Sequence, residues 1–70
     1  MINIELLKQL IEKKYEEVEG MTNKIINLSA ETGIAYSSIY KIISSKTCNL
    51  KNLIILKQTL GFEYSEMIVE

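Results

Sequence analysis

Apolar residues recur every three or four positions along most of the chain, and this spacing places them on one face of an α-helix. In the N-terminal part of the chain the repeat consists of Ile4, Leu7, Leu10, Ile11, Tyr15 and Val18. Asn3 precedes it, where its side chain can accept a hydrogen bond from an early helical N–H group, and Gly20 follows it as a natural stop. The pattern predicts a first helix over about residues 4–18.

Residues 28–45 predict two short helix segments joined by a tight turn. Gly33 stands where the chain must reverse, and glycine takes a positive φ without the clash that a Cβ would cause. Ser29 is small at the point where the two helices must cross closely. The apolar residues expected to face inward are Leu28, Ile34, Ile39 and Ile42.

Of these two helices, the first is expected to start at Thr22 or Asn23 as its N-cap and to run to about Glu31, and the second to span about residues 36–44. The side chains left on the outer face of the second helix can all form hydrogen bonds; they are Tyr36, Ser37, Ser38, Tyr40 and Lys41. A short helix with such a face, following a tight turn, is typical of proteins that insert one helix into the major groove of DNA.

A fourth helix is expected over about residues 50–60, with Asn49 as its N-cap and Gly61 as its stop. Its inward residues are predicted to be Leu50, Leu53, Leu56 and Leu60. Ile55 falls on the opposite side of this helix, where a polar residue would be expected. A short fifth helix is expected over residues 65–69.

The chain resembles the Cro and phage-repressor family of helix-turn-helix proteins, also called the XRE type, in the motifs LSAETGIAYSSIYKIISS, LKNLIILKQTLG and SEMI. The resemblance covers roughly residues 22–68. It implies an all-α, compact five-helix, lambda-repressor-like DNA-binding domain over residues 1–70, with the helix-turn-helix core at about 22–45. The chain departs from the family at Ala35, where the family commonly has a serine N-cap, and in a longer first helix.

The resemblance implies a sequence-specific transcriptional regulator, a Cro-like repressor encoded by a bacterium, a phage or another mobile element, that binds double-stranded DNA as a homodimer. The helix near residues 36–44 would enter the major groove, and its outward residues Tyr36, Ser37, Ser38, Tyr40 and Lys41 would meet base edges or phosphates. Phosphate contacts are expected at the start of the preceding helix and in the loop after the groove helix, at Thr22, Asn23, Lys24, Ser44, Lys46 and Thr47.

Each of these sets of residues also has a plainer interpretation. The residues at the start of the second helix would only cap it. Tyr36 and Tyr40 are four residues apart and would stack on each other across one helical turn. The loop after the third helix would simply be solvated. The sequence leaves these alternatives open.

The net charge of −1 argues against a nucleic-acid partner, because phosphate binding normally draws a basic surface. The distribution of charge reverses this argument. Residues 32–62 contain no acidic residue, and their charged side chains are Lys41, Lys46, Lys51 and Lys57. A locally positive face on an acidic protein is what attraction to DNA requires. The alternative is that the charges cluster by chance.

The 70 residues make one domain with a small core, and an apolar fraction of 47% is ample for it. Cys48, the only cysteine, excludes an intramolecular disulfide, suits a reducing cytoplasm and is expected to be a part-buried small residue. Because the chain has neither His nor Asp, we expect no metal site, no cofactor, no nucleophilic catalytic site and hence no enzyme. No apolar run approaches the ~18 residues of a membrane span, and no secretion signal is evident.

The C-terminal half carries more apolar side chains than so small a core is expected to absorb; they are Ile55, Phe62, Met67, Ile68 and Val69. We expect them to form a homodimer interface, unless the long first helix covers them. A rival interpretation is a protein-interaction module on the same scaffold, such as an antitoxin or anti-repressor with a regulatory protein as its partner. The overall acidity, Ala35 and the absence of arginine favour this rival.

Overall fold

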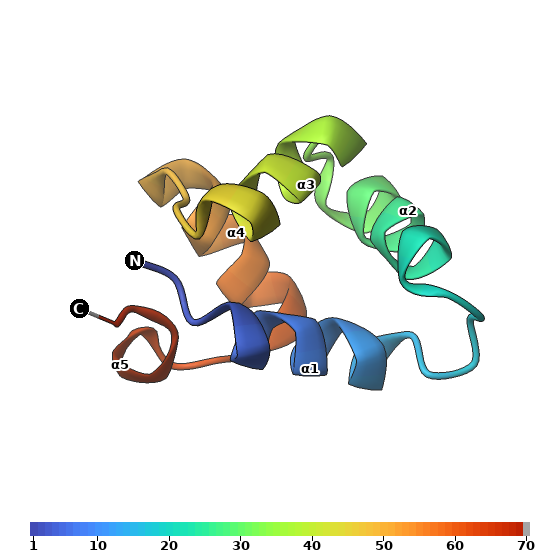
Figure 1. Cartoon of the computed structure of the whole chain (residues 1–70), viewed down its shortest axis with the longest axis horizontal. Helices are drawn as coiled ribbons and strands as arrows, with labels where there is room; N and C mark the ends of the chain where they lie inside the picture. The colour runs from blue at the N-terminus through green and yellow to red at the C-terminus, as the bar shows by residue number, and fades with distance from the viewer. Residues whose placement is uncertain (70) are drawn as a thin grey trace.

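The computed structural model describes residues 1–69, which form an all-α fold as predicted. Its helices are α1 (Ile4–Lys14), α2 (Met21–Thr32), α3 (Tyr36–Ser45), α4 (Leu50–Leu60) and α5 (Tyr64–Met67). Figure 1 shows α1 along one side of the molecule, α3 on the opposite side and α4 running between them. α2 lies at one end, and both termini lie at the other end beside α5. This arrangement leaves α3 at the outer edge of the molecule.

α1 begins where the sequence predicts and ends earlier. The Asn3 Oδ1 atom accepts a hydrogen bond from the Leu6 N–H group at 3.2 Å, which confirms the N-cap. The helix ends at Lys14, and Tyr15 leaves the helical conformation with φ −116° and ψ 40°. Glutamates gather in residues 16–19, and negative charge is unfavourable at the C-terminal end of a helix. Apolar periodicity alone therefore predicted too long a helix.

α2 has Gly20 as its N-cap, and the predicted capping by Thr22 or Asn23 is wrong. Gly20 has a φ of 84°, which residues with a Cβ rarely adopt. This backbone conformation redirects the chain into the helix. Thr22 and Asn23 lie inside the first turn, where the Asn23 Nδ2 atom donates to the Glu19 carbonyl at 3.0 Å. The first N–H groups of α2 therefore receive no side-chain cap.

Gly33 closes α2 in the left-handed conformation, as predicted, with a φ of 75°. A Cβ at this position would meet no atom within 4 Å, so the glycine is needed for its backbone conformation and not for space. The Ser29 Oγ atom donates to the Ile34 carbonyl at 2.6 Å, and the Thr32 Oγ1 atom accepts from the Ile34 N–H group at 3.2 Å. The turn therefore holds the start of α3, which follows Ala35 without a side-chain cap, against the end of α2.

α4 has the predicted caps but a different inner face. The Asn49 Oδ1 atom accepts a hydrogen bond from a first-turn N–H group at 2.8 Å, and Gly61 ends the helix. Leu53 and Leu56 are buried as predicted, whereas Leu50 is 68% exposed and its predicted inward position is wrong. Side chains lean toward the N-terminus of a helix, so the side chain of the first residue extends past the core.

One apolar core joins the helices and the N-terminal residues; its buried members are Ile2, Ile4, Leu7, Ile11, Tyr15, Ile25, Leu28, Ile34, Ile39, Ile42, Leu53, Leu56, Phe62 and Met67. The inward orientation predicted for Leu28, Ile34, Ile39 and Ile42 is thus confirmed. The Tyr15 hydroxyl is enclosed and has no hydrogen-bond partner among residues 1–69. Burial, and then the nearby Glu31 carboxylate, raise the pKa of Tyr15 above its ordinary value.

The core absorbs part of the C-terminal apolar set that the sequence assigns to a dimer interface. Phe62 and Met67 are 5% and 0% exposed, so their assignment to that interface is wrong. The reason is that α1 packs against both α4 and α5, which is the alternative left open by the sequence. Ile55 is half-buried against the core, and Ile68 and Val69 stay exposed. α5 is also shorter than predicted.

The two ends of the described chain pair with each other, as Figure 1 indicates. Ile2 and Ile68 form an isolated antiparallel bridge. The Asn3 N–H group donates to the Met67 carbonyl at 2.7 Å, and the Ile2 N–H group donates to the Lys46 carbonyl at 2.8 Å. The N-terminal residues therefore tie the end of α5 to the end of α3, a link that the sequence pattern does not predict.

Replacing a buried aliphatic side chain at the α2–α3 contact should strongly destabilise the protein. Leu28→Ala or Ile39→Ala should each lower the free energy of unfolding by ~2–5 kcal/mol, because truncation leaves a cavity in the packed core. Leu50→Ala is the matched control, since it truncates an exposed leucine, and it should change this free energy by only about 0.5 kcal/mol. Urea unfolding followed by circular dichroism measures all three. Equal losses for Leu28→Ala and Leu50→Ala would contradict the assigned inner faces.

Candidate nucleic-acid interface

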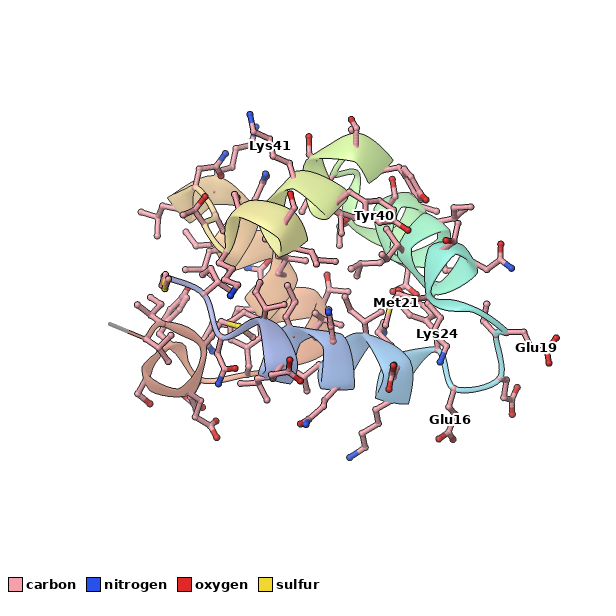
Figure 2. The ribbon with its side chains drawn as sticks, viewed as in Figure 1. Glu16, Glu19, Met21, Lys24, Tyr40 and Lys41 are labelled. Carbon is pink, nitrogen blue, oxygen red and sulfur yellow. The ribbon has the colours of Figure 1, made fainter. Side chains whose placement is uncertain are left out.

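α3 presents a polar outer face. Its inner side chains, Ile39 and Ile42, are buried, and the helix packs against α2. On the outer face Ser38 is half-buried, and the exposed residues are Tyr36, Ser37, Tyr40 and Lys41. Figure 2 shows Lys41 directed away from the body of the protein and Tyr40 directed along the surface toward α2. The sequence pattern therefore identified the two faces of α3 correctly.

Two tyrosines on this face contact each other. The ring centroids of Tyr36 and Tyr40 lie 4.7 Å apart with an interplanar angle of 54°, so the stacked alternative is the arrangement found. The Tyr40 hydroxyl also forms a hydrogen bond of 3.1 Å with the Thr22 hydroxyl. The neighbouring Tyr40 hydroxyl raises the pKa of Tyr36, whereas the Thr22 hydroxyl and then the Tyr36 hydroxyl lower the pKa of Tyr40. The two rings and the Thr22 hydroxyl thus form one cluster.

Hydroxyl groups near the end of α3 are engaged within the protein. The Ser44 and Ser45 Oγ atoms both donate to the Lys41 carbonyl, at 3.2 and 2.7 Å. The Ser45 and Thr47 hydroxyls are hydrogen-bonded to each other at 2.9 Å. Two hydroxyls near the start of α3 have no hydrogen-bond partner among residues 1–69; they belong to Ser37 and Ser38. The start of α3 therefore offers the hydroxyls that a ligand could use.

The start of α2 lies beside α3, as the Thr22–Tyr40 hydrogen bond shows. Thr22 and Asn23 are exposed, and Lys24 is half-buried. The first N–H groups of a helix have no partner within it, and Gly20 has no side chain that could cap those of α2. Such N–H groups, with the partial positive charge of the helix end, suit an anion. The structure therefore brings Thr22 next to the predicted residues of α3, whereas Figure 2 shows Lys24 on the side of α2 nearer to Glu16 than to Lys41.

A groove of about 450 Å³ separates the second half of α3 from the start of α4. It is lined by Ser38, Lys41, Ile42, Ser45, Thr47, Cys48, Asn49 and Asn52. The sequence pattern did not single out Asn49 or Asn52 as contacts. The signal that could have identified them is their place at the start of a helix that directly follows the loop. Burial raises the pKa of the Cys48 thiol, which agrees with the predicted part-buried position.

Lys46 lies apart from this groove. It follows α3 in the left-handed conformation, with a φ of 59°. It lines a separate groove beside the N-terminal residues, together with Ile4, Lys8 and Val69. The structure therefore does not group Lys46 with Lys41, although the sequence predicts both at the DNA surface.

The carboxylates lie outside the segment of residues 32–62, whereas lysines occur both inside and outside it. Lys41 is exposed on α3, within a segment that contains no carboxylate. Glu31 of α2 is 3.4 Å from the Nζ atom of Lys14 on α1, so it pairs across the α1–α2 contact. Glu16 and Glu19 belong to the turn between α1 and α2, and Figure 2 shows them near the start of α2 and away from Lys41. An approaching anion therefore meets little negative charge at α3.

Within residues 1–69 no helix has the length and apolar character needed to span a membrane. Comparison with known proteins gave no match: no family model fits the chain, and no curated protein or solved structure is significantly similar to it. The resemblance to the Cro and phage-repressor family therefore stays a prediction made from the sequence.

Proposed function

We propose that this protein is a sequence-specific DNA-binding regulator of transcription, a Cro-like repressor on a lambda-repressor-like scaffold. The observation that carries the proposal is the outer face of α3, where hydrogen-bonding side chains are exposed on a helix whose buried side chains are Ile39 and Ile42. α3 has 10 residues and is therefore about 15 Å long. A helix of this size on the outer edge of a small protein fits the major groove, which is ~12 Å wide.

The start of α3 supplies the groups that would read bases. Ser37 and Ser38 have hydroxyls without partners in the described structure, and helix-turn-helix proteins read bases chiefly with this end of the helix. Serine accepts several bases, and Lys41, one turn further on, can serve a guanine or a phosphate. Because the chain has no arginine and α3 has no Asn or Gln, direct readout would be modest and DNA shape would add to it.

Groups suited to DNA phosphates flank α3 on both sides. On one side the first turn of α2, which has no side-chain cap, offers its N–H groups. On the other side the groove between α3 and α4 offers the Lys41 ammonium group. Phosphate contacts on both sides of a groove-reading helix set its register and orientation on the duplex.

A single α3 reads only a few base pairs, which is too little to select one operator among many competing sites. The proposal therefore includes a homodimer whose two α3 helices lie ~34–36 Å apart on one face of the duplex. Because Phe62 and Met67 are buried, the interface would rest on the apolar side chains that remain exposed in the same half of the chain. These are Leu50, Ile54, Ile68 and Val69. Contact through a two-fold axis makes the same surface serve both subunits.

One observation favours a second candidate function, a protein-interaction module such as an antitoxin or anti-repressor. Leu50 and Ile54 stand four residues apart on α4, and both are exposed. An exposed apolar pair on a helix suits contact with another protein as well as with a second copy. The net charge of −1 agrees with a partner other than DNA. Binding measurements with DNA separate the two functions.

Removing a lysine from the α3 face should weaken binding to all DNA sequences. The test is a gel-shift titration, at two salt concentrations, against DNA that flanks the protein's own gene. Lys41→Ala should lower the affinity and reduce the slope of log affinity against log salt by about 1, because one lost phosphate contact releases about one fewer counterion. Lys13→Ala is the matched control, since Lys13 is exposed on α1, and should change neither quantity. Wild-type protein that fails to bind, or binding that Lys41→Ala leaves unchanged, would contradict the proposal.

Pairing of two subunits should depend on the exposed apolar residues of α4 and the C-terminal segment. Ile54→Glu combined with Ile68→Glu should abolish cooperative binding to an operator with two half-sites and leave the monomer folded, because these side chains are 40% and 47% exposed. Gel-shift titrations on full and half operators measure the cooperativity, and circular dichroism measures the fold. Gln9→Glu, at an exposed position of α1, is the control. Sedimentation that finds only monomers, both free and on a full operator, would contradict the homodimer.

A further inference from the structure

A single hydrogen bond joins the start of α2 to the middle of α3. It links the hydroxyls of Thr22 and Tyr40 at 3.1 Å, across 18 residues of sequence. The Tyr40 ring also packs on the Tyr36 ring, four residues earlier on α3. Figure 2 shows Tyr40 directed from α3 toward α2. Tyr40 is therefore engaged by its neighbours through both its ring and its hydroxyl.

We infer that Tyr40 does not read a base but acts with Thr22 as a positioning pair, which fixes the phosphate-binding start of α2 relative to the base-reading face of α3. The inference rests on the proposed DNA-binding function. It assigns to these two residues a role different from the direct contact that the resemblance implies. The groups left to touch bases on α3 are then chiefly Ser37, Ser38 and Lys41.

The geometry of the two helices explains why one more contact matters. Apolar packing holds the two helices together, and a polar contact joins them at the turn, where the Ser29 hydroxyl donates to the Ile34 carbonyl. A contact at the turn alone does not fix the angle between α2 and α3. This angle determines how far the start of α2 lies from α3. The Thr22–Tyr40 bond is a second polar contact, at the other end of α2, and it restrains that angle. The Tyr36 ring limits the rotation of Tyr40 and so keeps its hydroxyl in reach of Thr22.

The exposure of the pair indicates that its role is in binding and not in folding. Thr22 and Tyr40 are both exposed, so water competes for their hydroxyls and the bond adds little to the stability of the folded chain. Holding two DNA-contacting elements at the right separation before binding lowers the ordering cost of association. Loss of the bond should therefore weaken DNA binding more than it weakens the fold.

The test is a set of variants assayed on a duplex selected by the wild-type protein from random DNA. Tyr40→Phe keeps the ring and removes the hydroxyl, and Thr22→Val keeps the shape and removes the hydroxyl. Each should weaken binding by up to about fivefold, the size of one net hydrogen bond, with base preference unchanged and the melting temperature lowered far less than by a core truncation. The double variant should be no weaker than either single variant, because both remove the same interaction. Thr22→Ser, which retains a hydroxyl, should restore the affinity.

Ser37→Ala provides the contrast, since it should change the preference among bases. A change of base preference in Tyr40→Phe would show that Tyr40 reads a base and would overturn the inference. Additive losses in the double variant, or a melting temperature lowered as far as by a core truncation, would overturn it as well. If the wild-type protein selects DNA and both single variants bind that DNA as tightly as the wild-type protein does, the inference is overturned but the proposed function is not. Wild-type protein that selects no DNA overturns the proposed function and the inference with it.

Discussion

The packing of α2 against α3 around the Gly33 turn is the constraint on which the rest of the structure depends. Gly33 takes a left-handed conformation, and Ser29 and Thr32 hold the Ile34 backbone directly after it. Leu28 and Ile39 can then be buried from opposite sides of the turn. Because Leu28 and Ile39 fix the inner faces of the two helices, the polar residues of α3 lie on its outer face. The proposed function follows from this division of α3 into two faces.

The other helices complete the apolar core, which a turn and two short helices could not form by themselves. α1 packs against α2, α4 and α5, and it closes the core over Met67. The N-terminal residues add a backbone link, since the Ile2 N–H group bonds the Lys46 carbonyl at the end of α3. A 70-residue chain has little core to spare, so contacts at both ends of the chain contribute to holding α3 in place.

Features set by local chemistry were predictable from the sequence, whereas features set by packing were not. Asn3 and Asn49 cap their helices as expected because a cap depends only on the next turn. Leu50 continues the apolar repeat but lies at the first position of α4, beyond the core. The burial of Met67 depends on where α1 lies, and periodicity within α5 carries no such information. The Thr22–Tyr40 bond joins positions 18 residues apart, so no local sequence pattern predicts it.

DNA binding by the face made by α3, the start of α2 and the start of α4 is the feature on which the proposed function depends. Nuclear magnetic resonance titration of the labelled protein with a duplex selected from random DNA tests it most directly. If this face binds DNA, the largest shifts of amide signals should fall in residues 21–24, 36–41 and 47–52, with small shifts along α1. Shifts concentrated on α1 and α5, or no shifts with any duplex, would contradict it.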